Sequence, residues 1–238
     1  MQVTLPIPQI HKCLQNPLNA AIVCFGAKII KQKPIILGPR VLKALQEKPD
    51  LRIDAGQKLQ VPVDKPFGDE QLEILGGISP QNARKIGTLI LRSTNITDRG
   101  LTYLNLQNFT SLKKLDLANT EITNAGLAHL EYLTHLEELD LAGTQITNTG
   151  LKCLKPLTNL NKLDLASTQI SGTGFKYLQD LNTLKTLYLS DDMDITDEGL
   201  EYLQGLTLQR IFLWKTKTPK IDKDRLQTFL PNRIIIHK

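Results

Sequence analysis

The stretch Leu112–His135 reads LKKLDLANTEITNAGLAHLEYLTH, and further copies of its pattern begin at Leu136, Leu160 and Leu184. The next leucine in register is Leu208, so each step along the chain is 24 residues long. The copies follow the skeleton L-x-x-L-x-L-x-x-T-x-I-T-x-x-G-L-x-x-L-x-x-L. Self-similarity at a fixed period indicates a stack of structural repeats.

One copy, read from Leu136 onward, has the pattern of a strand, a turn and a short helix. Leu139 and Leu141 alternate with polar residues, which is the periodicity of a strand. Thr144 then ends the strand, because its hydroxyl can bond to nearby backbone where the chain turns. Thr147 is placed to cap a helix whose buried side carries leucines at three-residue spacing, namely Leu151, Leu154 and Leu157. Such a unit cannot bury both apolar faces alone, so neighbouring copies must stack.

Three columns of residues stay in register through the copies: a turn column, a cap column and a glycine column. They are Thr94, Thr120, Thr144, Thr168 and Thr216; Thr97, Thr123, Thr147, Ser171 and Thr196; and Gly100, Gly126, Gly150, Gly174 and Gly199. The period and the leucine spacing are those of leucine-rich repeats. The sequence therefore predicts an α/β fold, a right-handed leucine-rich repeat solenoid with a parallel concave sheet, helices on the convex side and terminal caps.

The repeats divide the chain into three predicted parts. Residues 68–78 align with residues 196–206, which indicates a degenerate repeat ahead of the clear ones. The ends of a solenoid must be closed to water by atypical units. We therefore predict an N-terminal helical and extended cap over residues 1–80, leucine-rich repeats over residues 81–216 and a C-terminal cap over residues 217–238.

Two local irregularities carry their own predictions. Alternating runs flank Asp54–Gln57, which favours a hairpin or a strand–turn–strand unit at that point. The first clear repeat begins at Ile86 and is two residues longer than the others. Its surplus lies near Leu106–Asn108, in the helix of this repeat or just after it, and we expect this irregularity to be a loop.

Charge is unevenly distributed along the chain. The net charge is +5; residues 1–65 and 215–238 are basic, whereas residues 66–214 carry 18 acidic and 12 basic side chains. A nucleic-acid-binding protein would place its positive charge on the recognition face, and here that face belongs to the acidic part. No apolar run approaches the roughly 18 residues needed to cross a bilayer. Neither nucleic acid nor a membrane is therefore expected as a partner.

Cysteine usage and the N-terminal stretch bear on the compartment. Cys13, Cys24 and Cys153 are odd in number and lack paired spacing, which indicates free thiols in a reducing environment. Residues 20–30 are apolar apart from Lys28, but the residues before them are mostly neutral, which disfavours a cleavable signal peptide. We expect a cytoplasmic chain, and delivery into a host cell without such a signal stays open.

The residues that alternate with the strand leucines should form the concave face of the sheet. Its predicted columns combine a charged middle with aromatic residues towards the C-terminal end, and exposed aromatic residues beside arginine are typical anchors of protein interfaces. We predict that a partner protein contacts Arg92, Lys114, Asp116, Glu138, Asp140, Lys162, Asp164, Tyr188, Arg210, Phe212 and Trp214.

Purely structural roles for these columns stay open. Aspartate at this place can be a habit of the repeat type, and the aromatic cluster can pack under the C-terminal cap. Asp116, Asp140 and Asp164 should stand about 4.8 Å apart on adjacent strands, and we expect Lys114 and Lys162 to offset their repulsion. A metal site built from these aspartates is disfavoured, because no loop offers an evident set of carbonyl ligands.

No catalytic constellation is evident in the sequence. The histidines His129 and His135 fall on or just after a helix, away from the predicted strand face. The chain has no glycine-rich phosphate loop and no metal-ligand spacing. We therefore predict a chain that is not an enzyme, that uses no cofactor and no metal, that binds another protein, and that is a monomer on its own.

The repeat columns over residues 86–216 resemble bacterial leucine-rich repeat proteins of the 24-residue class, which are related to the GALA type and to the cysteine-containing type of F-box proteins. Thr94, Thr120, Thr144 and Thr168 occupy the place where those families usually carry Asn or Cys. The resemblance implies a protein-binding scaffold, in some bacterial members an effector that an intracellular pathogen delivers into a host cell.

Residues 5–24 are also similar to part of an F-box, through Leu5-Pro6 and through Leu18–Cys24, although the expected Trp is missing and Lys28 lies near its place. That resemblance implies the alternative function, a substrate adaptor of a ubiquitin ligase.

Overall fold

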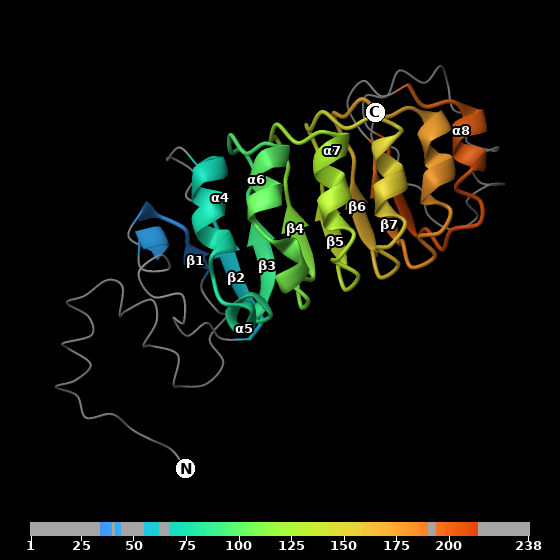
Figure 1. Ribbon diagram of the computed structural model, residues 1–238. Helices are drawn as coiled ribbons and strands as arrows, with labels where there is room; N and C mark the ends of the chain where they lie inside the picture. Colours follow the sequence, from blue (N-terminus) through green and yellow to red (C-terminus); the bar gives the residue numbers. More distant parts are fainter. Residues whose placement is uncertain (1–33, 40, 44–54, 62–66, 190–193, 214–238) are drawn as a thin grey trace, which may run out of the picture.

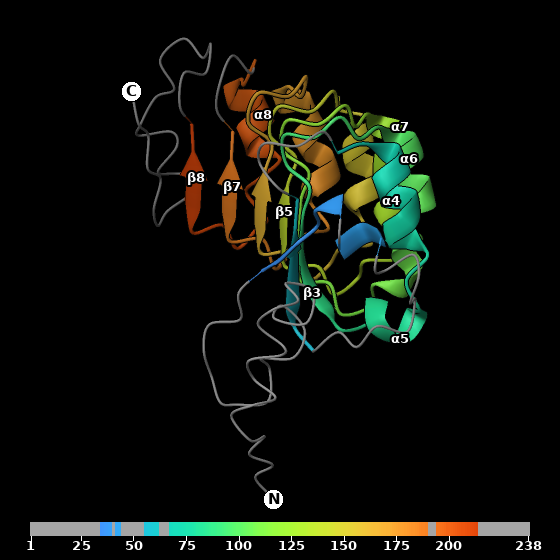
Figure 2. The same cartoon turned by 90° about the vertical axis from the view of Figure 1, so that its left-hand side faces the viewer.

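The computed structural model describes residues 34–39, 41–43, 55–61, 67–189 and 194–213. Its described part is a single sheet of eight strands in chain order, and every pair of neighbours is parallel. Helices cover one face of this sheet and leave the other uncovered by helices, as two perpendicular views show (Figures 1 and 2). The predicted leucine-rich repeat solenoid is confirmed.

The strands stand in the register that the sequence columns predict. Leu115, Leu139 and Leu163 pair side by side, and so do Asp116 and Asp140. The strands are short because each turns away again at the end of its leucine alternation. Their bounds are β1 Ile35–Ile36, β2 Gln57–Gln60, β3 Ile86–Ile90, β4 Lys114–Asp116, β5 Glu138–Asp140, β6 Lys162–Asp164, β7 Thr186–Tyr188 and β8 Arg210–Phe212.

The N-terminal end of the sheet differs from the prediction. β2 pairs in parallel with β1 on one side and with β3 on the other, so it is not part of a hairpin. The alternative, a strand–turn–strand unit, stays a prediction, because residues 51–54 lie outside the described residues. Gly56 has a positive φ of 75°, which turns the chain directly into β2. The degenerate repeat is present as β2 followed by a helix over Asp69–Gly76, and the sheet continues without interruption across residue 80.

The helical layer mixes α-helix with 3-10 helix. A three-residue spacing of buried leucines matches the three residues per turn of a 3-10 helix, and the repeats at Gly150 and Gly172 adopt it throughout. The surplus residues of the first clear repeat lie at the expected place but form a short 3-10 helix, where a loop was predicted. The bounds are α4 Asp69–Gly76, α5 Pro80–Ala83, α6 Asp98–Tyr103, η2 Leu106–Asn108, α7 Asn124–Leu127, η3 Ala128–Leu130, η4 Gly150–Leu154, η5 Gly172–Leu178 and α8 Asp197–Glu201.

One apolar core lies between the sheet and the helices. The leucine columns are almost fully buried; Leu115, Leu163 and Leu187, for example, have no exposed surface. The turn column closes the core at the strand ends, because the Thr144 hydroxyl donates to the Leu141 carbonyl at 2.6 Å. Thr94, Thr120 and Thr168 make the same bond one repeat apart. The prediction for this column is confirmed at each of these four positions.

The cap column joins neighbouring repeats as well as starting helices. Thr97, Thr123 and Thr196 accept a hydrogen bond from a helix backbone amide, as predicted. Thr147 does not cap in this way: its backbone amide donates to Asn124 Oδ1 of the preceding repeat at 2.9 Å, and Asn124 Nδ2 donates to its hydroxyl at 2.8 Å. Ser171 has the same two bonds with Asn148.

These inter-repeat contacts explain the glycine column. A Cβ at Gly150 would collide with Asn124 Oδ1, and a Cβ at Gly174 would collide with Asn148 Oδ1. At Gly100, Gly126, Gly150 and Gly174 the side chain of the preceding repeat occupies the space of a Cβ, and at Gly199 the backbone of Gly172 does. The sequence patterns at 1–33, 190–193 and 214–238, including the F-box-like segment and the C-terminal cap, lie outside the described residues, so the domain boundaries stay predictions.

Candidate protein-binding face

We call the sheet surface that points away from the helices the open face; it corresponds to the predicted concave face. Its side chains alternate with the core leucines along each strand. Two columns cross it from strand to strand: Lys58, Thr88, Lys114, Glu138, Lys162, Thr186 and Arg210, and Ile36, Gln60, Ile90, Asp116, Asp140, Asp164, Tyr188 and Phe212. The structure thus brings together every predicted contact residue that it describes; Trp214 lies outside the described residues.

The aspartates of the second column have a structural task. Oδ1 of Asp116, Asp140 and Asp164 accepts a hydrogen bond from the backbone amide two residues further on, at 3.2, 3.1 and 3.0 Å respectively. These bonds hold the chain where it leaves each strand. A local structural role for aspartate at this place is therefore real, and only the second carboxylate oxygen is left to face outward.

The charges on the aspartates are compensated by an arginine as well as by the predicted lysines. Arg92, from the end of the preceding strand, places its guanidinium 3.5 Å from Asp116 Oδ2 and 3.8 Å from Asp140 Oδ2. Lys114 pairs with Glu138 at 2.8 Å instead, and the Lys162 ammonium lies over the Tyr188 ring, 5.2 Å from its centroid. The two lysines form no ion pair with the aspartates, but the charge of Lys114 lowers the pKa of Asp116 and the charge of Lys162 lowers the pKa of Asp164, as predicted, and Arg92 lowers both.

Asp164 is the carboxylate of this row that lacks an ion pair with any described cation. The pKa of Asp164 is raised to about 6, mainly by burial and also by the charge of Asp140, while the hydrogen bond from the Ala166 amide and the charges of Lys162 and Arg92 oppose the increase. Burial, followed by the charge of Asp140, also raises the pKa of Asp116, which is only 4% exposed. Charge at the middle of the open face is therefore partly shielded from water and is strongest towards β6.

The C-terminal end of the open face is aromatic. Tyr188 on β7 and Phe212 on β8 are stacked with their ring centroids 4.4 Å apart and their planes 4° from parallel. Both side chains are half-buried, and Arg210 beside them is exposed. The alternative role for these rings, packing under the C-terminal cap, concerns residues that the structure does not describe.

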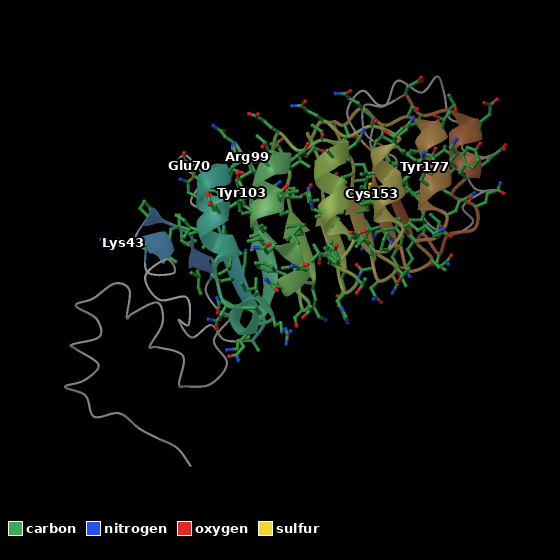
Figure 3. The ribbon with its side chains drawn as sticks, in the orientation of Figure 1. Lys43, Glu70, Arg99, Tyr103, Cys153 and Tyr177 are labelled. Atoms are coloured by element: carbon green, nitrogen blue, oxygen red, sulfur yellow. The ribbon has the colours of Figure 1, made fainter. Side chains whose placement is uncertain are left out.

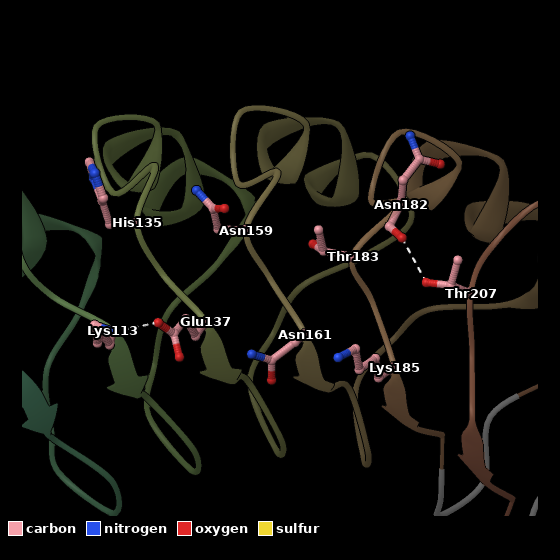
Figure 4. Close-up of a pocket in the computed structure, with 9 residues that line it drawn as sticks. All are labelled: Lys113, His135, Glu137, Asn159, Asn161, Asn182, Thr183, Lys185 and Thr207. Atoms are coloured by element: carbon pink, nitrogen blue, oxygen red, sulfur yellow. Dashed lines mark hydrogen bonds and ion pairs between the residues drawn. The ribbon is translucent and has the colours of Figure 1, made fainter.

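A recess that the sequence did not suggest lies at the edge of the sheet where the chain enters the strands (Figure 4). Its volume is about 530 Å³ and its lining is polar. Part of that lining joins repeats: the hydroxyl of Thr207 donates to the Asn182 carbonyl at 2.7 Å, and Lys113 pairs with Glu137 at 2.7 Å. The signal was present in the sequence as a polar residue directly before the first leucine of each repeat.

The helical face carries its own polar and aromatic contacts. Arg99 donates to the Tyr103 hydroxyl, and Lys152 lies 5.1 Å from the centroid of the Tyr177 ring (Figure 3). Cys153 is half-buried and packs against the core. Within the described ranges no three His, Cys, Asp or Glu residues are grouped as a metal site would require. No helix in that part of the chain is long and apolar enough to cross a membrane.

Comparison with known proteins agrees with this architecture. Residues 110–170 match the family model described as leucine rich repeat. Comparison with curated protein sequences returned no match. Among solved structures, an internalin (inlF) from Listeria monocytogenes is similar, with a TM-score of 0.52 and 21% sequence identity over 81% of this chain and 69% of the internalin. At that identity the likeness concerns the fold alone, which is a leucine-rich repeat solenoid.

Proposed function

We propose that this chain is a non-catalytic protein-binding module whose partner lies on the open face. The single observation that carries the proposal is the Tyr188–Phe212 stack, which stands on the side of the sheet that no described helix covers. In the same column, the three preceding strands β4, β5 and β6 present aspartates. The packing of one repeat against the next does not require a change from charged to aromatic residues within one column. We therefore infer that the change serves contact with a partner.

The chemistry of these residues suits an interface anchor. Aromatic rings bury a large apolar area at low conformational cost, and tyrosine keeps a hydroxyl for a polar contact. Interface hot spots are enriched in Trp, Tyr and Arg, and truncation of such an anchor costs about 2 kcal/mol or more. Arg210 is exposed on β8 next to the stack, so an aromatic anchor and a guanidinium lie on the same strand pair.

The charged columns should set the rate and the specificity of association. Glu138 pairs with Lys114 and is partly exposed, so a partner meets this pair at the surface. Charges in such positions steer diffusional encounter more than they add affinity. We therefore propose that residues over β3–β6 orient the partner, and that the stack on β7 and β8 holds it.

The wider role is part of the proposal. We propose a cytoplasmic regulator or an effector delivered into a host cell, of the bacterial 24-residue repeat class, that occupies or inhibits a functional surface of its partner. The alternative, an F-box-like adaptor, rests on residues 5–24, and no observation on the described residues favours it.

The test uses the full chain with two sets of changes. The partner is recovered by affinity capture on the immobilised chain, purified, and measured by calorimetry against the Tyr188→Ala/Phe212→Ala double variant. We expect the affinity to fall about tenfold or more, which corresponds to roughly 1.4 kcal/mol or more. Tyr132→Ala is the matched control, because Tyr132 is 53% exposed and follows the helix η3 on the other side of the molecule.

Two outcomes would contradict the proposal. One is unchanged affinity in the double variant with folding verified by circular dichroism. The other is a larger loss in Tyr132→Ala, which would move the contact to the helical face.

A further inference from the structure

The open face presents an uneven balance of charge between β4 and β7. Its inner column has three carboxylates, on Asp116, Asp140 and Asp164, and the described guanidinium that pairs with two of them enters from Arg92 at the N-terminal end. Asp164 is the member furthest along the sheet from that guanidinium, and no described cation pairs with it. The carboxylate without an ion pair therefore lies on β6, directly beside the aromatic end, and Lys162 and Arg92 offset its charge only at longer range.

The surface next to Asp164 is formed by small side chains. The residues two positions after the aspartates are Ala118, Ala142 and Ala166, which have short side chains. Arg92 reaches the carboxylates of Asp116 and Asp140 but forms no ion pair with that of Asp164. Each aspartate uses Oδ1 for a backbone amide, which fixes the carboxylate plane and leaves Oδ2 to face outward. A charged donor that approaches Asp164 thus meets an acceptor that is already oriented.

The Tyr188 ring lies beside Asp164, and both of its faces have neighbours within this chain. In the strand register Asp164 stands opposite Tyr188, and the chain's own Lys162 lies over that ring at 5.2 Å. Phe212 covers the ring from β8. The rims of the two rings are therefore the apolar surface that remains for a partner, next to a partly shielded carboxylate.

We propose that the open face over β5–β8 recognises a segment of a partner protein that presents a lysine or an arginine to Asp140 and Asp164, followed by an apolar side chain against the Tyr188–Phe212 stack. The inference rests on the proposed function, and it adds the chemistry of the partner. Charge complementarity selects a basic residue, because a cation at Asp164 forms a charge-assisted hydrogen bond in a site partly removed from water.

The groups around Asp164 give the interaction a dependence on pH. The charged or titratable groups that face it are Asp140 from β5, Lys162 from its own strand, Tyr188 from β7 and, at longer range, Arg92. Burial raises the pKa of Asp164 to about 6. A lysine or an arginine stays charged throughout this range, so binding should weaken as the pH falls through about 6 and should release protons near that pH.

The experiment uses a displayed library of random short peptides, selected on the immobilised full chain. We expect the selected peptides to be enriched in Lys or Arg next to an aromatic or aliphatic residue. In fluorescence titrations Asp164→Asn should weaken the selected basic peptides about tenfold and remove the pH dependence between about 5 and 7, because hydrogen bonds to charged groups contribute roughly that much. Asp180→Asn is the matched control, since Asp180 is an exposed carboxylate that pairs with Lys155 away from the sheet.

The outcomes separate this inference from the proposed function. Selected peptides that are acidic or uncharged, yet lose affinity on Tyr188→Ala/Phe212→Ala, would overturn the basic-residue preference and leave the open face as the binding site. Peptides that are insensitive to both sets of changes would overturn the proposed function as well. An equal loss of peptide affinity in Asp164→Asn and Asp180→Asn would show non-specific attraction and would overturn the inference. A selection that yields no peptide would overturn it as well.

Discussion

Gly174 offers the sharpest test of how neighbouring repeats are joined. The nearest atoms that a Cβ at this position would meet belong to Asn148 of the preceding repeat. Asn148 cannot move freely, because its Oδ1 accepts from the Ser171 amide at 2.8 Å and its Nδ2 donates to the Ser171 and Thr173 hydroxyls at 2.8 and 3.1 Å. Gly174→Ala must therefore displace a side chain that makes three hydrogen bonds.

The magnitude follows from those bonds. Each ordinary hydrogen bond contributes about 1 kcal/mol net, so loss of two or three of them destabilises by about 2–3 kcal/mol. Alanine also has fewer backbone conformations than glycine in the unfolded chain, and this effect stabilises the folded state by roughly 0.4–1 kcal/mol. We expect the free energy of unfolding to fall by about 2 kcal/mol, measured by urea denaturation with an unchanged slope. Gly205→Ala is the control, because a Cβ there meets nothing within 4 Å, and it should be neutral.

A double-mutant cycle identifies the cause. In an Asn148→Ala background the colliding amide is gone, so Gly174→Ala should cost little more, and the coupling free energy between the two positions should be about 2 kcal/mol. An equal cost of Gly174→Ala in both backgrounds would refute the reasoning, since the collision would then not be with the Asn148 amide.

Further predictions concern single groups. Thr144→Val should lower the free energy of unfolding by about 1 kcal/mol, because the buried Leu141 carbonyl loses its 2.6 Å hydroxyl donor; urea denaturation measures it, and no change would contradict the role of the turn column. Because the pKa of Asp164 is raised to about 6 in the folded chain, its contribution to stability is greatest below the unfolded pKa near 4 and is lost as the pH rises through about 6. Asp164→Asn should therefore remove a decline in stability between these pH values, and an unchanged pH profile of thermal unfolding would contradict this. Arg92→Gln should cost no more than about 1 kcal/mol, because its pairs with Asp116 and Asp140 are 3.5 and 3.8 Å long and Arg92 is 54% exposed; calorimetry showing a larger loss would mean that the bridge is structural.

The fold could be predicted from the sequence because it repeats. Leucines at fixed spacing determine which side of each strand is buried, and a slip of one residue would reverse every side chain, so the register of Leu115 and Leu139 followed directly. The turn threonines were predictable for the same reason, since each makes a bond to a carbonyl three residues away. β1 was not predicted, although Ile35 and Ile36 precede their partners Leu59 and Gln60 by one 24-residue period, because a strand of two residues is too short to show an alternation of its own.

The sequence predicted which residues lie on the open face, but it did not predict which of them contact one another. Strand alternation placed Asp116, Glu138 and Tyr188 on one face correctly. It could not show that Arg92 reaches across to two aspartates, because an arginine at the end of a strand has several rotamers and the choice depends on neighbouring charges. Nor could it show that Asn124 rather than Thr147 organises the start of a repeat, since both residues are good capping residues by type.

Two polar rows cross this solenoid, and they differ in what they leave unused. Asn124 and Asn148 use both Oδ1 and Nδ2 in hydrogen bonds to the next repeat, in space that a glycine leaves free. This row therefore serves stability and has no polar atom left for a partner. The open-face row spends one carboxylate oxygen inside its own repeat and leaves the other facing outward. The first row is filled by Asp69, Asp98, Asn124 and Asn148, each of which accepts a hydrogen bond from a backbone amide of the next repeat. The second row changes in chemistry, from isoleucine to aspartate between β3 and β4 and from aspartate to tyrosine between β6 and β7. The joining row tolerates the exchange of aspartate for asparagine, because both present an oxygen acceptor to the backbone amide of the next repeat. The step from Asp164 to Tyr188 instead replaces a carboxylate by an aromatic ring, so it changes the chemistry that a partner on the open face would meet.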